Sequence, residues 1–480
     1  MILYNLIKNE LYKIFHKKST YVVLIIIFLF TILVNYIYTH ELYTDYYTVD
    51  KDYINELEID VKNLEDNGGN LEDIVFKKTE LDTQKLCLKY KDDMWKVNAI
   101  ETFYYDDLTS YYEALIINNN KIEANKIKLK LDEMQKNLKE DNWIYFANLK
   151  LKEDENYLNS LKVSRSLEQS EIKLEEINYN IKIMEEKVNL DKYRIDKKIG
   201  YESYLADAID TAYDSYESVI QYNNAKNDKE KEEFKAGYKA YYESKYILDK
   251  KIDTNNEQSI RGVIKNLYTE FEFFIIVFVI MISGAIVSDE FNKGTIKNLL
   301  TVPKTRKKIL LAKYLSVLLL IPFIVLFIFI SEMIIGGLFF GYSSLSIPVI
   351  NYIIDSNTMS VMHVFTYFIV TFVTKLPIVI LLATLAFALS TIINNTAISI
   401  AITICGYIAS TIINQLAYAF NIKILNYFVT TNWDFSVYLF GESSMFNNSV
   451  IHAIIICVVY YLIMIVTSFI IFKRKNIKNI

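Results

Sequence analysis

The chain has 480 residues, of which 52% are hydrophobic and 23% charged, and its formal net charge is −5. These averages resemble those of a soluble protein, but the charges are unevenly distributed. Residues 39–272 contain 35 Lys and Arg against 50 Asp and Glu, a net charge of −15, whereas the flanks contain 17 against 7, a net charge of +10. Uncharged runs in the flanks reach membrane-spanning length, which excludes a wholly soluble protein.

The composition of the acidic block favours long helices over a strand-rich domain. All four prolines lie beyond residue 300, and the block contains only five of the twelve glycines. Only one of the three cysteines, Cys87, lies in the block. A disulfide framework is therefore excluded, and we do not expect cysteine-ligated metal.

The N-terminus predicts a helix in the membrane interface, followed by a first span. Residues 1–20 place apolar side chains on one helical face and four lysines elsewhere, which we expect to meet anionic headgroups. Residues 21–38 form an uncharged run of 18 residues, enough to cross a bilayer core. No small-residue cleavage site follows, so we predict an uncleaved transmembrane helix rather than a signal peptide.

Further apolar runs predict five more spans, at residues 271–287, 310–338, 365–390, 397–420 and 450–472. Fifteen Lys and Arg lie in the short segments 1–20, 288–313 and 473–480, whereas the short loops 339–364 and 421–449 contain only Lys423. The positive-inside rule then predicts cytoplasmic termini and an extracellular block at residues 39–270. The predicted fold is an all-α membrane protein, with six transmembrane helices and a helical, partly coiled-coil extracellular domain between spans 1 and 2.

Within residues 39–270, heptad-like spacing predicts a short coiled-coil seam over residues 167–195. Its members are Leu174, Ile177, Ile181, Met184 and Val188. Helix breaks are expected near residues 67–69, 118–120, 200 and 223–228, which gives a stalk-like bundle. Numerous tyrosines, among them Tyr201 and Tyr213, form either packing or a ligand surface, and we favour packing.

Motifs for catalysis are missing from the sequence. It contains no phosphate-binding loop, no His-Glu-x-x-His and no Gly-x-Ser-x-Gly, and its four histidines are isolated. We therefore expect a chain that is not an enzyme and that itself carries no cofactor, metal or nucleic acid.

An ordered motif follows the second predicted span. An acidic residue, a Gly-Thr pair, an apolar pair, a proline and a basic residue precede the next span, which begins near a lysine. These residues are Glu290, Gly294, Thr295, Leu299, Leu300, Pro303, Arg306 and Lys313. The pattern resembles the loop that characterises ABC type-2 exporter permeases. The amphipathic N-terminus and six spans match the same family, so the resemblance covers residues 1–38 and 271–480.

The resemblance implies a cytoplasmic coupling helix at residues 288–303, which receives motion from a separate ATPase subunit that binds ATP and Mg. It also implies a dimer, formed with a second copy or a related permease, that exports an amphipathic substrate from a bacterial cell. A helix over residues 289–301 would end before Pro303, which cannot continue it. Alternatively, the segment is only a basic loop that satisfies the orientation rule, with its apolar residues packed on lipid.

Three residues are candidates for a substrate pathway. Glu332 and Lys375 lie in apolar runs, where an unpaired charge is costly. They form either an outer-leaflet pair that contacts a charged substrate or two independent side chains that snorkel, and we favour snorkelling. Trp433 lies in an aromatic loop that resembles the paired half-membrane helices of the family, although it could equally anchor the interface.

Two matters stay open at the level of sequence. The substrate could be a peptide, a lipid or a drug; we favour cationic, for example antimicrobial, peptides because of the acidic block, whose charge could equally serve only solvation. The alternative function is a structural membrane component of a secretion apparatus, resembling phage-infection-protein-like proteins and lacking ATPase coupling. Residues 288–303 discriminate between the two functions.

Overall fold

The computed structural model describes residues 2–40, 51–253, 258–296, 305–420, 422–439, 446 and 448–475. The chain divides into two compact units. We call Met1–Leu42 with Asn256–Ile480 the membrane unit, and Tyr43–Asn255 the helical unit. Each is treated separately below.

Six helices of the membrane unit are long and apolar enough to cross a membrane, as predicted. They are α2 (Lys18–His40), α12 (Ile260–Ala285), α15 (Arg306–Phe340), α16 (Val364–Ile393), α17 (Thr396–Ala419) and α19 (Val450–Arg474). The short helix α1 (Ile2–Phe15) precedes them, and α13 (Ser288–Asn292) follows α12. Helix α12 begins eleven residues before the predicted position, because the polar first turns of this helix are buried in protein.

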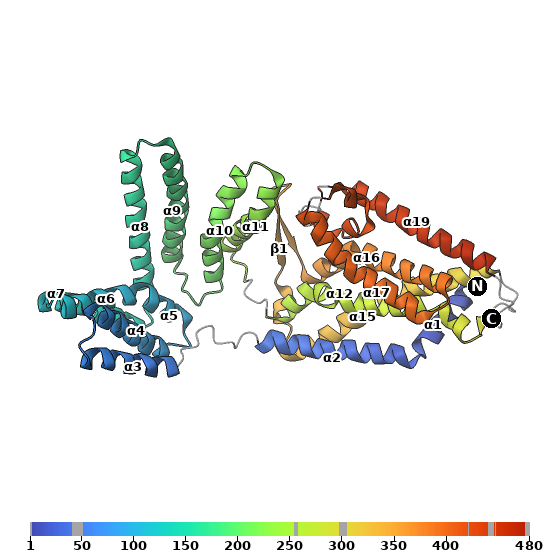
Figure 1. The fold of residues 1–480 in the computed structure, drawn as a ribbon, viewed down its shortest axis with the longest axis horizontal. Coiled ribbons are helices and arrows are strands. Elements are labelled where there is room, and N and C mark those ends of the chain that lie inside the picture. The colour runs from blue at the N-terminus through green and yellow to red at the C-terminus, as the bar shows by residue number, and fades with distance from the viewer. Residues whose placement is uncertain are drawn as a thin grey trace. The chain divides into compact units, whose positions relative to one another are not determined.

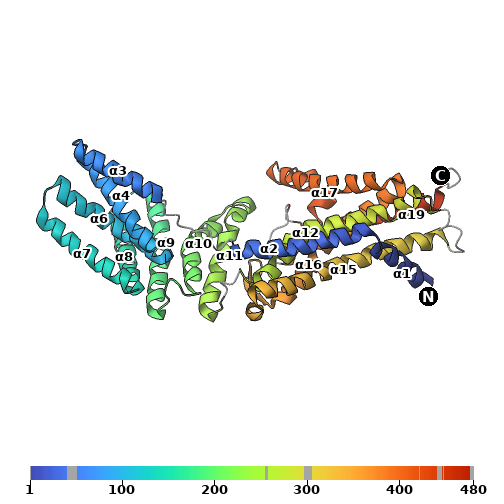
Figure 2. The same cartoon turned by 90° about the horizontal axis from the view of Figure 1, so that it is seen from below.

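The core of the membrane unit lies around α12, which contacts α2, α15, α16 and α17. Its large apolar side chains Phe271, Ile276 and Phe278 are almost completely buried. In Figure 1 both labelled termini lie at one end of the unit, and Figure 2 shows α2 running beside α12. We call the end that carries α1, α13 and the last turn of α19 the terminal end.

A small β-hairpin departs from the all-helical prediction. Strand β1 (Val349–Ile353) pairs antiparallel with β2 (Thr358–Met362), and Val349 lies opposite Met362. Asn357 in the turn has φ 52°, a left-handed conformation that asparagine tolerates better than most residues. The strands are too short, at five residues each, to stand out from a loop in the sequence.

The helical unit consists of helices, described in chain order. They are α3 (Lys51–Asp66), α4 (Leu71–Lys89), α5 (Met94–Ala99), the π-helical turn η2 (Ile100–Tyr104), α6 (Tyr105–Tyr112), the π-helical turn η3 (Glu113–Ile117), α7 (Lys121–Lys139), α8 (Trp143–Leu167), α9 (Glu171–Lys197), α10 (Ala206–Asn224) and α11 (Asp228–Lys250). All four predicted breaks fall between helices. At one of them Gly68 has φ 65°, which a side chain would disfavour.

The predicted seam on α9 packs within this unit. Ile181, Met184 and Val188 are buried against Leu158 of α8, and α8 and α9 are neighbours in sequence and space (Figure 1). The apolar stripes predicted on α7 and α10 likewise enter buried clusters. The stripe on α9 is therefore covered by its neighbour, α8, in the same chain.

Candidate functional site

The terminal end of the membrane unit contains a buried group of charges, which we call the ionic cluster: Glu10, Lys13, Glu290 and Lys313. Lys313, on the first turns of α15, is only 1% exposed. Its Nζ lies 2.7 Å from Glu10 Oε2, 3.3 Å from Glu290 Oε1 and 3.0 Å from the carbonyl oxygen of Ile286. This lysine therefore joins α1, the end of α12 and α13 to α15.

Glu290 is the second centre of the ionic cluster. Its Oε1 accepts a hydrogen bond from Lys13 Nζ at 2.8 Å, and its Oε2 accepts one from Thr295 Oγ1. Burial opposes ionisation of this carboxyl, but Lys313 and the hydrogen bonds from Lys13 and Thr295 outweigh it and lower the pKa of Glu290 to about 2. The carboxylate is therefore charged throughout the physiological pH range and is turned inward.

A second set of contacts fixes α13 to the junction between α16 and α17. Asp289 accepts hydrogen bonds from Lys17 Nζ at 2.6 Å and from Thr396 Oγ1 at 2.8 Å. Burial raises the pKa of Asp289, but these two bonds outweigh it and hold that pKa below its ordinary value. The backbone N–H of Ser288 donates to Ser390 Oγ at 2.9 Å.

Two other residues of the loop motif shape its boundaries. Gly294 has φ 67°, a conformation that an L side chain rarely adopts, which gives a physical reason for glycine here. Arg306 Nη1 donates to the carbonyl oxygens of Lys473 at 3.3 Å and Lys475 at 3.0 Å. The start of α15 is thus attached to the end of α19.

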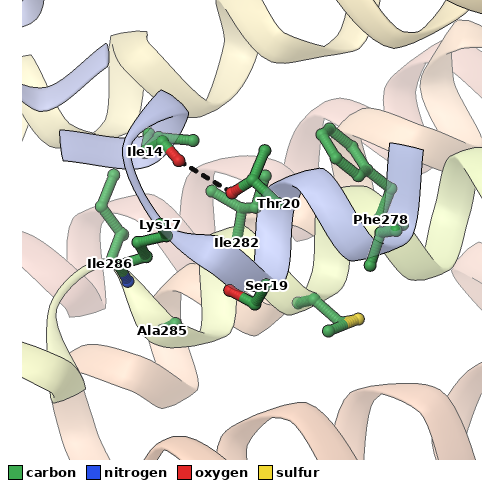
Figure 3. A pocket seen from close by; sticks show the side chains of 10 residues that line it. Ile14, Lys17, Ser19, Thr20, Phe278, Ile282, Ala285 and Ile286 are labelled. Atoms are coloured by element: carbon green, nitrogen blue, oxygen red, sulfur yellow. Dashed lines mark hydrogen bonds between the residues drawn. The ribbon is translucent and has the colours of Figure 1, made fainter. Parts of the chain in front are cut away.

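Beside the ionic cluster, the bend between α1 and α2 encloses a cavity of about 50 Å³ against the end of α12 (Figure 3). Thr20 Oγ1 donates to the carbonyl oxygen of Ile14 at 2.8 Å and thereby closes the bend. Phe278 and Ile282 supply apolar walls. The cavity holds only a water or two, so it is a packing feature of the bend rather than a substrate site.

The ionic cluster corrects the prediction for the lysines of the N-terminal helix. We expected all four to meet anionic headgroups, but Lys13 pairs with Glu290 and Lys17 with Asp289. The apolar side of α1 packs on α15, with Ile14 buried. A charged segment that is 270 or more residues away competes successfully with the headgroups, because its carboxylates are held at short range.

The structure thus places Glu290, Gly294, Thr295 and Arg306 together at the terminal end. The three remaining motif residues, Leu299, Leu300 and Pro303, lie outside the described residues. What the described part does chemically is mechanical: it forms a charge-neutral fastening between segments 288–296, α1 and α15, with no group arranged for covalent chemistry. Among the described residues there is no cluster of His, Cys, Asp and Glu suited to a metal ion.

Glu332 and Lys375 are not paired with each other, and neither snorkels alone. Glu332 is 0% exposed, and its Oε2 accepts a hydrogen bond from Asn35 Nδ2 of α2 at 2.6 Å. Lys375 bonds to Asp434, and its Nζ lies 4.0 Å from Glu272 Oε2 of α12. Each charge is therefore matched by a polar group from a different element, which avoids exposing it to lipid.

Trp433 is buried in the core of the membrane unit rather than standing at an interface. Its loop contains η5 (Lys423–Tyr427), η6 (Val429–Thr431) and α18 (Ser436–Leu439). Over residues 422–439 these pieces are too short for the predicted half-membrane helices, because five residues of 3₁₀-helix rise only about 10 Å. Asp434 and the amide of Asn432 bond within this loop instead.

Several partners escaped the sequence analysis although a signal was present. Glu10 lies three residues after Ile7 and four before Ile14, so it occupies the apolar face of α1, where a charge indicates a buried partner. Glu272 lies inside the run assigned to the second span from residue 271. Asn35 is a lone amide in the first span. Asp289 and Asp434 gave no such signal, because both lie in polar segments.

The fold defines a multi-pass membrane protein that carries a separate helical unit. The chain belongs to the family described as “Protein of unknown function (DUF2705)”, whose model matches residues 219–478. The chain is similar to “Uncharacterized protein YhcI” of Bacillus subtilis (strain 168), with 29% identity over 178 residues, which is 36% of this chain and 57% of that protein. No solved structure matches the chain. The family match includes Glu290 and Lys313 but not Glu10 or Lys13.

Proposed function

We propose that this chain is the permease subunit of an ATP-binding-cassette exporter. In this proposal it is a bacterial plasma-membrane protein with cytoplasmic termini that works as a dimer. A separate ATPase subunit binds ATP and Mg, hydrolyses the ATP and docks on residues 288–303. The permease contributes no chemical catalysis and moves an amphipathic substrate out of the cell or the membrane.

The observation that carries the proposal is the position of Glu290 in the ionic cluster. Through Lys13 and Lys313, this one carboxylate is bonded to both α1 and α15. A displacement of the loop by a bound partner would therefore pull on an interfacial helix and on a membrane-crossing helix together. A loop that served only to orient the chain would not need its acidic residues buried against two helices.

The distribution of basic residues supports the proposed orientation. The three segments richest in Lys and Arg meet at the terminal end, where Lys17 contacts Asp289 and Arg306 contacts the backbone of Lys473. A cytoplasmic terminal end would satisfy the positive-inside rule for all three. It would also present residues 288–303 to a cytoplasmic ATPase.

Polar groups buried among the membrane helices support a transport role. Glu272, Lys375 and Asp434 meet where α12 and α16 adjoin the loop before α19, and Glu332 meets Asn35 between α15 and α2. Ionisable groups at such depth are expensive and commonly line the route of a substrate. A cationic or amphipathic peptide is the substrate that we favour, because the helical unit is strongly acidic.

Co-purification tests the proposal. The tagged chain, expressed with ATPases encoded beside it and extracted in mild detergent, is expected to retain one of them. Leu299→Asp combined with Leu300→Asp is expected to abolish this binding, because charges would disrupt an apolar docking surface. Val361→Asp, on exposed β2, is the matched control and should leave binding intact.

Retention of the ATPase by the Leu299→Asp and Leu300→Asp chain would contradict the placement of the docking segment. If the unaltered chain retained no ATPase, the proposed function itself would fail, and a structural membrane component would become the better description.

A further inference from the structure

The helical unit contains a cavity of about 420 Å³ where α5, η2, α8, α9 and α10 meet. Much of its wall is aromatic, with contributions from Trp95, Phe103, Phe146 and Tyr201. Phe146 is 1% exposed, so this wall is part of the packed interior. The volume lies in the range of small-molecule sites, and aromatic walls suit an apolar ligand body.

The cationic groups that line the cavity already have anionic partners. Arg194 is 4% exposed; it bonds to Asp210 and its guanidinium stands 4.4 Å from the centre of the Tyr201 ring. Lys150 Nζ lies 3.5 Å from Asp154 Oδ1. These contacts leave little positive charge to attract an anionic ligand.

Asp191, in contrast, lines the cavity without a cation of its own. The residue is 7% exposed, and its Oδ2 is buried with no hydrogen-bond partner among the described residues. Burial and the nearby carboxyl of Asp154 raise the pKa of Asp191 to about 7. A carboxylate in such a place is destabilised unless a donor or a positive charge reaches it.

We propose that this cavity binds an organic cation with an apolar body, such as an amphipathic amine. Its ammonium group bonds to Asp191, and its apolar part packs on Phe103 and Phe146, with Trp95 and Tyr201 close enough to add cation–π attraction. The ligand supplies the donor that Asp191 lacks. The inference goes beyond the proposed function, which requires no ligand site in the helical unit, and it does not depend on an ATPase.

The test uses the full chain in detergent and two probes of nearly equal shape, 4-phenylbutylamine and 4-phenylbutan-1-ol, titrated by calorimetry. We expect the amine to bind about 10- to 100-fold more tightly than the alcohol, the range for a hydrogen bond to a charged group. Asp191→Asn should remove this preference, whereas Asp191→Glu should keep it in part. Asp66→Asn, an exposed position on α3, makes the same charge change and controls for non-specific attraction to the acidic unit and for uptake by micelles.

The thermal unfolding midpoint separates lost binding from lost structure. Because Asn has no charge to bury, the Asp191→Asn chain should unfold at or above the temperature of the unaltered chain. Equal affinities for the two probes, or an unchanged preference for the amine in the Asp191→Asn chain, would overturn the proposal. Neither result bears on ATPase docking, so failure here is distinguishable from failure of the proposed function.

Discussion

Replacing Lys313 with methionine is expected to destabilise the membrane unit by about 3–5 kcal/mol, the usual cost of removing one partner from a buried ion pair. Methionine fills a similar volume but leaves Glu10 and Glu290 facing each other with only Lys13 between them. The free energy of unfolding, measured by titration with a denaturing detergent, reports the loss. Lys308→Met, at an exposed position on the same helix, is the matched control and should change stability by less than about 1 kcal/mol.

A compensated variant distinguishes electrostatics from packing. Glu10→Gln and Glu290→Gln, added to Lys313→Met, remove both unpaired carboxylates and should restore much of the lost stability. Equal losses for Lys313→Met and Lys308→Met would show that the ionic cluster does not hold the terminal end together. A failure of the compensated variant to recover would attribute the loss to packing instead.

Acidification is expected to release residues 288–296 from α1 and α15. The folded-state pKa of Glu290, about 2, lies below its ordinary value of 4.5. Its contribution is therefore fully present above about pH 4.5 and is lost as the pH falls toward 2. Asp289, whose pKa is also lowered, changes in the same direction. For Glu290 the loss amounts to about 1–3 kcal/mol once solvent screening of its exposed part is included.

The unfolding temperature in detergent, measured between pH 7 and pH 3, checks this prediction. The unaltered chain should lose more stability on acidification than Glu290→Gln, which has no carboxyl to protonate at that position. Asp355→Asn, in the exposed turn of the β-hairpin, removes an equivalent charge and should retain the full pH dependence. Parallel curves for the unaltered chain and Glu290→Gln would refute the assigned role of this carboxylate.

Features with a local cause were predictable from the sequence. The six apolar helices follow from uncharged runs, and the helix breaks follow from residues such as Gly68, which adopts a left-handed conformation. The short β-hairpin was missed for the same reason, since five-residue strands provide too little periodicity.

Partners in the folded chain were much less predictable. Lys13 and Glu290 are 277 residues apart, and Glu10 and Lys313 are 303 residues apart. A single sequence shows that each charge is unusual but not which charge it meets. For this reason Glu332 and Lys375 were considered as a pair, whereas they bond to Asn35 and Asp434. The loop motif revealed that Glu290 matters, but not that it faces inward.

Photo-crosslinking in living cells tests the central claim most directly. A photoreactive amino acid replaces Lys293, an exposed residue just after α13, or Asn357, an exposed residue in the turn of the β-hairpin. We expect position 293 to crosslink to an ATPase subunit and position 357 not to do so, because the ATPase would dock beside the ionic cluster at the terminal end. Crosslinking of an ATPase from position 357 but not from position 293, or from neither, would contradict the proposed coupling.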